Sequence, residues 1–227
     1  KLKISIIIPT LNEEKNVKHI STDLKSMEHK EIIIVDGGST DNTLKYSRNE
    51  KFTIYTSEAS RGKQLLKGAR ESKGEWLLFI HADTRLNHDC LKEISSFISI
   101  KENKLNIGFF RLNYNSVKIS SKIISFWANL RSLVFRLPFG DQCLLIKKDN
   151  YFRLKGHSEI PIMEDIKFIL KIPYFKRKLL NNSVISSYKK FCDNGVILQC
   201  LKHGLCQILF FLGVDSDFIN KIYKRKW

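Results

Sequence analysis

Four short apolar runs, each followed by polar residues, lie at 3–9, 31–35, 52–56 and 75–80. They are rich in β-branched and aromatic side chains, as is typical of buried strands. Segments with helical periodicity separate them, and this alternation predicts βαβ units around a mostly parallel sheet, hence an α/β protein. Because such crossovers are right-handed, we expect the carboxyl ends of the four strands along one edge of the sheet.

Capping residues predict where the helices between these strands begin. Asn12 can cap a first helix, and Ser39 or Thr40 can cap a second. Residues 57–63 are expected to form a loop, and a third helix is expected over 64–72.

Beyond residue 86 the periodicity is weaker. No repeat, low-complexity tract or linker interrupts the chain, so we expect one domain over residues 1–227. Helices are expected at 90–100, 116–137, 161–173, 196–214 and 215–224, and strands at 106–114 and 142–147.

The charge balance favours anionic partners. The chain has 39 Lys+Arg against 23 Asp+Glu, a formal net charge of +16, which suits nucleotides, phosphate-bearing lipids, a membrane surface or nucleic acid. No basic tail, zinc-finger spacing or aromatic RNA-binding motif supports nucleic acid in particular. No uncharged run reaches the ~18 residues that a membrane span needs.

The cysteines favour a reducing compartment. There are five, an odd number, and none are spaced as CxxC, so we expect free buried thiols instead of disulfides. The chain opens on a strand-like segment without a signal peptide. We therefore expect a cytoplasmic location.

His81 and Asp83 directly follow the apolar run at 75–80. Ligands of open α/β sheets bind outside the carboxyl ends of the strands. Mg²⁺ and Mn²⁺ take oxygen ligands and keep several waters, so one carboxylate and the phosphates of a substrate can hold such an ion. The alternative is a helix-capping Asp beside a structural His.

Two loops carry residues that suit a nucleotide. Asp36 begins the loop Asp-Gly-Gly-Ser-Thr-Asp and could accept hydrogen bonds from a base or a ribose, although the loop lacks GxGxxG. Arg61 and Lys63 flank a glycine and could meet a diphosphate. The alternatives are a capped turn for the first loop and a solvated surface loop for the second.

Glu164 and Asp165 are adjacent carboxylates with apolar neighbours. Charge repulsion and desolvation would raise their pKa values, as a general base that deprotonates a hydroxyl requires. The alternative is a pair of acids favoured by the positive end of a helix dipole.

Six motifs in order resemble the family 2 glycosyltransferases, over nearly the whole chain. The resemblance is to a bacterial branch of short, single-domain members with His-Ala-Asp in place of Asp-x-Asp. The motifs are Pro9-Thr-Leu-Asn-Glu13, Val35-Asp-Gly-Gly-Ser-Thr-Asp41, Arg61-Gly-Lys-Gln64, Leu78-Phe-Ile-His-Ala-Asp83, Gly140-Asp-Gln142 and Met163-Glu-Asp165.

This resemblance implies a Rossmann-like three-layer α/β/α sandwich of the nucleotide-diphosphosugar transferase type. It also implies roles for individual residues. The metal ligand would be Asp83 and the catalytic base Asp165, with Glu164 beside it. The substrate-binding residues would be Pro9, Thr10, Asn12, Glu13, Asp36, Gly38, Arg61, Lys63, His81, Asp141 and Gln142.

The function implied is inverting transfer of a sugar from a nucleotide-diphosphate donor, a UDP-sugar, to a hydroxyl acceptor, with Mg²⁺ or Mn²⁺. Residues 1–85 would bind the nucleotide and 86–190 the acceptor, and 191–227 would form C-terminal helices. His81 stands where many relatives have Asp. The rival functions are a nucleotidyltransferase on a similar fold, and a non-catalytic basic module that binds nucleic acid or a membrane surface.

The expected helices at 116–137 and 196–214 each carry a polar stripe against an apolar surround. They could lie on an anionic membrane, in which case the chain is peripheral on the inner face of the cell membrane and the acceptor is a lipid. They could instead simply close the core, and we favour this second interpretation. His157 and His203 are expected to be structural.

Overall fold

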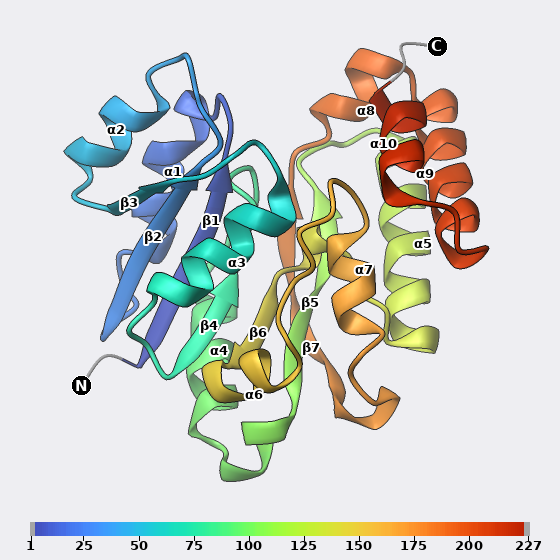
Figure 1. The fold of residues 1–227 in the computed structure, drawn as a ribbon. Helices are drawn as coiled ribbons and strands as arrows, with labels where there is room; N and C mark the ends of the chain where they lie inside the picture. The colour runs from blue at the N-terminus through green and yellow to red at the C-terminus, as the bar shows by residue number, and fades with distance from the viewer. Residues whose placement is uncertain (1–2, 225–227) are drawn as a thin grey trace.

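A computed structural model describes residues 3–224, and Figure 1 shows helices on both faces of one sheet. The sheet has seven strands in the order β3-β2-β1-β4-β6-β5-β7. The strands are β1 (Ile4–Thr10), β2 (Lys30–Asp36), β3 (Thr53–Thr56), β4 (Trp76–Phe79), β5 (Ile107–Tyr114), β6 (Leu144–Lys147) and β7 (Arg177–Ser186).

The helices connect these strands and extend the chain beyond β7. The α-helices are α1 (Glu14–Leu24), α2 (Thr43–Asn49), α3 (Arg61–Glu71), α4 (His88–Ser99), α5 (Ile119–Phe135), α6 (Lys148–Arg153), α7 (Glu164–Ile169), α8 (Lys189–Asn194), α9 (Val196–Phe211) and α10 (Ser216–Lys224). Short 3₁₀ helices are η1 (Lys101–Leu105), η2 (Gly140–Gln142) and η3 (Tyr174–Lys176).

The pairing of the strands decides which loops meet. β1 pairs in parallel with β2 and β4, and β2 with β3, so the ends of these four strands share one edge, as expected. β6 runs antiparallel to β4, with Leu144 opposite Phe79. Because β6 runs the other way, its beginning and the preceding η2 lie at the edge where β4 ends.

Two apolar clusters fill the space between the sheet and its two helical layers. Alternate residues of a strand point to opposite faces, and β1 sends Ile6 to one cluster and Ile7 to the other. The first cluster includes residues of α1, α4 and α5, and the second includes residues of α3, α6 and α7. The arrangement is a three-layer α/β/α sandwich, as the resemblance implied.

Some expected boundaries were wrong. Helix α3 begins at Arg61, so Arg61 and Lys63 lie in its first turn and not in a loop. The helices α1 and α2 have Glu13 and Asn42 at their N-cap positions, in place of the expected caps.

The sequence did not predict strand β7 or the short helices α6 and α8 of the second half. The polar run Asn181-Asn182-Ser183 interrupts the apolar pattern of β7. That run is compatible with a strand because β7 is at the edge of the sheet, where only one neighbour contributes pairing.

The interpretation that α5 and α9 simply close the core was wrong, because their apolar sides do not face it. The buried residues of α5 are Ser121, Ser125, Ala128 and Ser132, and those of α9 are Gln199 and Cys206. Large apolar side chains of both helices are exposed instead. Within residues 3–224, no helix is both long and apolar enough to cross a bilayer.

The cysteines are unpaired, as expected. The expectation that they are buried was wrong for two of them, since Cys192 and Cys200 are exposed.

Candidate active site

The loop after β2 is organised around the carboxylate of Asp36, which is fully buried. Its Oδ1 accepts hydrogen bonds from Thr10 Oγ1 (3.0 Å) and Ser39 Oγ (2.5 Å), and its Oδ2 accepts from the backbone N–H groups of Gly38 (2.9 Å) and Ser39 (2.8 Å). A carboxylate has about four acceptor positions, so Asp36 uses all of them on Thr10 and on its own loop. A base could hydrogen-bond to Asp36 only by displacing one of these partners.

The loops after β1 and β2 are joined by further hydrogen bonds. Asn12 has a left-handed backbone (φ 57°), which Asn tolerates better than most residues. Its Oδ1 accepts from the backbone N–H of Thr40 (2.9 Å), and its own N–H donates to Ser39 Oγ (2.8 Å). Asn12 therefore joins the two loops. The prediction that it caps α1 was wrong. Glu13 adds a third bond, from its N–H to Thr43 Oγ1 (2.7 Å).

Two further predicted site residues, Pro9 and Gly38, also lie in this region. Pro9 is half-buried in β1, which it does not end, since the strand continues to Thr10. Gly38 has φ +95°, a conformation that favours glycine.

The loop after β4 carries His81 and Asp83 and is anchored on both sides. The N–H of Thr84 donates to the carbonyl of His81 (3.1 Å), which closes a turn. The guanidinium of Arg85 makes a bidentate ion pair with Asp23 (2.6 and 2.5 Å), and the backbone of Arg85 exchanges two hydrogen bonds with that of Ile185 in β7 (2.8 and 3.1 Å). Asp83 is half-buried at this turn.

Gly140 in η2 lies between the loop after β4 and helix α7. Its N–H donates to Asp165 Oδ2 at 2.7 Å. A Cβ on Gly140 would lie 2.5 Å from His81 Nε2 and 3.4 Å from Asp165 Oδ2. His81 and Asp165 therefore approach one point although 84 positions separate them in the sequence, and only glycine fits there.

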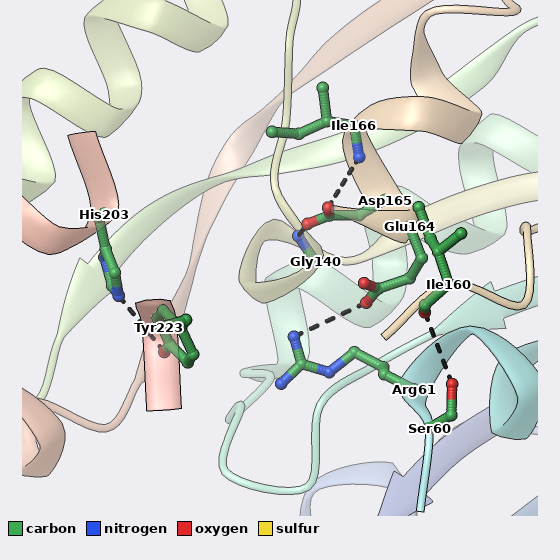
Figure 2. A network of polar contacts seen from close by, with 9 residues as sticks. All are labelled: Ser60, Arg61, Gly140, Ile160, Glu164, Asp165, Ile166, His203 and Tyr223. Carbon is green, nitrogen blue, oxygen red and sulfur yellow. Dashed lines mark hydrogen bonds and ion pairs between the residues drawn. The ribbon is translucent and has the colours of Figure 1, made fainter. Parts of the chain in front are cut away.

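Figure 2 shows helix α3 meeting the beginning of α7 through an ion pair. The guanidinium of Arg61 lies 3.7 Å from Glu164 Oε1, with side chains 44% and 2% exposed. Gly62 permits this approach, since a Cβ there would lie 2.1 Å from the carbonyl oxygen of Ser158. Burial lowers the pKa of Arg61, but Glu164 and Asp165 outweigh this effect and raise it.

The other oxygen of Asp165 also has a partner. Its Oδ1 accepts from the N–H of Ile166 at 2.7 Å, so two backbone N–H groups hold the carboxylate in place. Each oxygen keeps a second acceptor position.

Burial raises the pKa of two acids in this region. The pKa of Glu164 rises to about 7, with a further increase from Asp165 that the Arg61 guanidinium opposes. The pKa of Asp141 rises to about 6, where Arg131 opposes the effect of burial and Asp165 and Asp83 add to it.

Carboxylates outnumber cations in this cluster, which holds Asp83, Asp141, Glu164 and Asp165 against Arg61 and Arg131. Asp141 Oδ1 and Glu164 Oε1 are buried without a hydrogen-bond partner among residues 3–224. An acidic cluster in which two buried oxygens lack a hydrogen bond suits a divalent cation. No three His, Cys, Asp or Glu side chains of the described residues converge on one ion position, so a bound cation would take further ligands from substrate and water.

Arg131 is the residue of this cluster that sequence reasoning missed. Its guanidinium lies 3.4 Å from the centroid of the Phe139 ring, and it donates to the carbonyl of Leu137 (3.1 Å) and to Gln142 Oε1 (3.2 Å). The only signal in the sequence was an arginine one residue before Ser132, which belongs to the polar stripe of the expected helix.

The side chains of Gln142 and Lys63 are both held by other residues of the protein. Gln142 is buried, accepts from Ser132 Oγ (2.8 Å) and donates to the carbonyl of Phe110 (2.9 Å), so it ties α5 and η2 to β5. Lys63 pairs with the exposed Glu58 at 2.6 Å.

The two histidines expected to be structural have protein partners. His157 is buried, and its Nδ1 lies 2.9 Å from Tyr151 Oη. The ring of His203 stacks on that of Tyr223, with centroids 5.7 Å apart. Tyr223 also contributes to the raised pKa of Arg61, which places α10 beside the cluster.

The fold defines the class of this protein. A seven-stranded sheet with one antiparallel strand beside β4, helices on both faces and an acidic cluster at the strand ends make a Rossmann-like sandwich of the nucleotide-diphosphosugar transferase type.

The model of the family described as "Glycosyl transferase family 2" matches residues 5–153. This is more than half of the chain, which therefore belongs to glycosyl transferase family 2.

Curated relatives agree with this assignment. Poly(ribitol-phosphate) beta-N-acetylglucosaminyltransferase TarS of Staphylococcus aureus is 30% identical over 108 residues, which are 43% of this chain and 19% of TarS. An uncharacterized glycosyltransferase of Haemophilus influenzae is 27% identical over 188 residues, 74% of this chain and 61% of that protein. The chain thus spans about a fifth of the length of TarS and less than two thirds of the Haemophilus relative.

Solved structures share the fold. TarS 1–349 in complex with UDP-GlcNAc superposes with a TM-score of 0.60 at 20% identity, covering 82% of this chain and 58% of that one. The mannosyltransferase PcManGT of Pyrobaculum calidifontis, in complex with GDP-Man and Mn²⁺, superposes with a TM-score of 0.65 at 18% identity. The match covers 99% of this chain and 65% of that one.

Proposed function

We propose that this chain is an inverting glycosyltransferase that moves a sugar from a UDP-sugar to a hydroxyl acceptor. The observation that carries the proposal is the meeting of His81 and Asp165 at Gly140. It brings the loop after β4, where Asp83 would face the diphosphate, beside the carboxylate that would accept a proton. Residues 1–85 would bind the nucleotide and residues 86–190 the acceptor.

The nucleotide would lie over the joined loops after β1 and β2. Pro9, Thr10, Asn12 and Glu13 would line it, and Gly38 would allow close approach of the backbone. Because all acceptor positions of Asp36 are in use, its role would be to shape the uracil site, or to exchange the Ser39 hydroxyl for the base.

The diphosphate would lie toward Arg61 and the loop after β4. Arg61 is part-exposed and already held by Glu164, so it is placed for an anion without large rearrangement. His81 would donate to a phosphate oxygen. Lys63, held by Glu58 in this structure, would have to exchange that partner to take part.

The acidic cluster fits a divalent cation, Mg²⁺ or Mn²⁺, with Asp83 as its protein ligand. When bound, this ion would neutralise charge on the departing diphosphate as a Lewis acid. Mn²⁺ is present with PcManGT and with the glucosyl-3-phosphoglycerate synthase of Mycobacterium tuberculosis, another structural neighbour at a TM-score of 0.65.

The chain's own residues would handle the acceptor. The acceptor oxygen forms a bond to the anomeric carbon while the bond from that carbon to the diphosphate oxygen breaks, and the bonding electrons leave with the nucleoside diphosphate. Asp165 takes the proton of the acceptor hydroxyl. Attack from the face opposite the diphosphate inverts the anomeric centre. Asp141 and Gln142 would form the floor of the sugar pocket.

We also propose that the acceptor is a lipid and that the chain works as a peripheral protein on an anionic membrane, at the inner face of the cell membrane. The support is the excess of basic residues and the exposed apolar side chains of α5 and α9.

The experiment for the transferase proposal is a donor-turnover assay on a panel of nucleotide sugars with Mn²⁺. Release of UDP, with the sugar recovered on an acceptor or as an inverted hydrolysis product, supports the proposal. Release of pyrophosphate from a nucleoside triphosphate and a sugar phosphate, without UDP release, would make the chain a nucleotidyltransferase.

A further inference from the structure

We propose that the outward faces of α5, α9 and α10 form a docking surface for an anionic phospholipid bilayer. The apolar face of these helices is the side chains of Ile119, Ile123, Phe126, Trp127, Leu133, Val134, Phe135, Ile197, Leu201, Leu205, Ile208, Phe211, Leu212 and Phe218, all of them exposed. Only one part of this inference rests on the proposed function, namely that a lipid is the acceptor.

Helix α5 is oriented opposite to an ordinary surface helix, which turns its apolar stripe inward. Its inward side is formed by small and polar residues, and Asn129 fixes it by accepting from the N–H of Leu112 (2.8 Å) and donating to its carbonyl (2.9 Å). Phe126 and Trp127 point outward, 60% and 63% exposed. The exposed aromatic side chains are therefore a consequence of how α5 is fastened, and not of loose packing.

Helix α9 repeats this orientation. Gln199 is buried and its Nε2 lies 2.6 Å from His203 Nε2, so the polar stripe faces the protein. Ile197 and Leu212, at the two ends of the helix, are 77% and 74% exposed. Helix α10 packs against α9 and adds the exposed Phe218.

The three helices lie together on one side of the molecule, at the right in Figure 1. Helix α8 and the residue before it connect them. Tyr188 Oη donates to Ser120 Oγ of α5 (2.8 Å), and the ring of Phe191 in α8 contacts that of His203 in α9 (centroids 5.8 Å apart). Monomeric proteins rarely expose apolar patches larger than a few hundred Å², so this side is expected to be covered by a partner.

Charge identifies the partner as an anionic bilayer. Helices α5 and α9 contain no Asp or Glu, and α10 has one Asp against two Lys. Lys118 and Lys122 stand exposed at the beginning of α5. A helix with a basic polar part and an exposed aromatic and aliphatic face suits the interface of an anionic membrane. A second copy of this chain would instead bring like charges together, since each carries +16.

The helices that carry the docking surface lie near the candidate active site. Tyr223 of α10 stacks on His203 of α9, and Figure 2 draws this pair beside Arg61 and Glu164. A bilayer seated on the apolar face would therefore contact the outer side of helices whose inner side lies near the acidic cluster.

Vesicle sedimentation tests the proposal with the full chain. Wild type should bind vesicles that contain about a third phosphatidylglycerol more tightly than pure phosphatidylcholine, and less at high salt. The triple variant Trp127→Gln, Leu201→Gln, Phe211→Gln should lose about tenfold or more in partitioning, because it removes large apolar contacts. The matched control is Ile100→Gln, Leu105→Gln, at two exposed apolar residues outside the apolar face, and it should bind like wild type.

A second variant tests the proposal even if the triple variant does not fold. Lys118→Glu, Lys122→Glu should weaken binding to the anionic vesicles and leave binding to phosphatidylcholine unchanged. UDP binding, measured without vesicles, should be the same in all variants, so a failure of docking is distinguishable from a failure of the transferase proposal. Equal vesicle binding by wild type and the triple variant overturns the inference. So does a lipid-free dimer of wild type that the triple variant loses, which would make the face an interface between copies.

Discussion

The backbone N–H of Gly140 donates a hydrogen bond of 2.7 Å to the carboxylate of Asp165. The bond joins η2, which enters the one strand that runs antiparallel beside β4, to the first turn of α7. It also explains how an acid late in the chain comes to face the residues that follow β4. The proposed chemistry depends on this contact more than on any single charged pair.

The first prediction concerns Asp165 as the proton acceptor. Asp165→Asn should lower turnover by roughly 10²–10⁴-fold, because an amide cannot accept the proton of the acceptor hydroxyl. UDP-sugar affinity, measured by calorimetry, should change little. Asp149→Asn, at an exposed acid outside the cluster, is the control and should turn over like wild type. Unchanged turnover of Asp165→Asn would remove Asp165 from the mechanism.

The second prediction concerns Gly140. Gly140→Ala should lower turnover at least about tenfold, because its Cβ would meet His81 Nε2 at 2.5 Å and displace one side of the site. The matched control is Gly204→Ala, where a Cβ would have nothing within 4 Å and the helix should gain about 0.5–1 kcal/mol. Steady-state kinetics and chemical denaturation of both variants provide the comparison, and full activity of Gly140→Ala would contradict the tight approach.

The third prediction concerns the buried Glu164. Because its pKa is raised to about 7 in the folded protein, the folded state binds the extra proton, and wild type loses stability as pH rises from about 4.5 through 7. Glu164→Gln removes this loss. The variant should match wild type near pH 5 and be more stable by about 1–3 kcal/mol at pH 8.

Urea denaturation at the two pH values measures this difference. Glu159→Gln, at an exposed acid, is the control. A stability difference for Glu164→Gln that does not change with pH would show that the raised pKa is wrong.

The fourth prediction concerns His157. Burial lowers its pKa to about 3, with a smaller contribution from Lys171, so the folded state keeps the ring neutral while the unfolded chain binds a proton below pH 6.5. Wild type should therefore lose about 2 kcal/mol between pH 7 and pH 5 from this group alone. His157→Gln should show a smaller loss, with His19→Gln at an exposed histidine as the control. Equal slopes for wild type and His157→Gln would refute the prediction.

Strands β1, β2 and β4 could be predicted because their central residues are apolar and buried between two helical layers. β7 could not, since Asn181-Asn182-Ser183 is acceptable only at the edge where the strand lies. Arg61 was placed in a loop because nothing in the sequence shows that Gly62 packs against Ser158.

The orientation of α5 shows a second limit. Its stripes were visible in the sequence, but the side that faces the sheet depends on the bonds between Asn129 and Leu112, which join positions 17 residues apart. Likewise Asp36 was identified as a ligand candidate, while its four internal partners come from the folded geometry of two loops.

The most direct test of the account is a thermal-shift panel of nucleotide sugars, with and without Mn²⁺, on wild type and Asp83→Asn. A UDP-sugar should raise the melting temperature of wild type with Mn²⁺, and at a hundredfold excess over Kd the stabilisation should be about 2.7 kcal/mol. Asp83→Asn should lose the part that depends on Mn²⁺. If no nucleotide sugar shifts wild type, or if Asp83→Asn responds like wild type, the account of this site is contradicted.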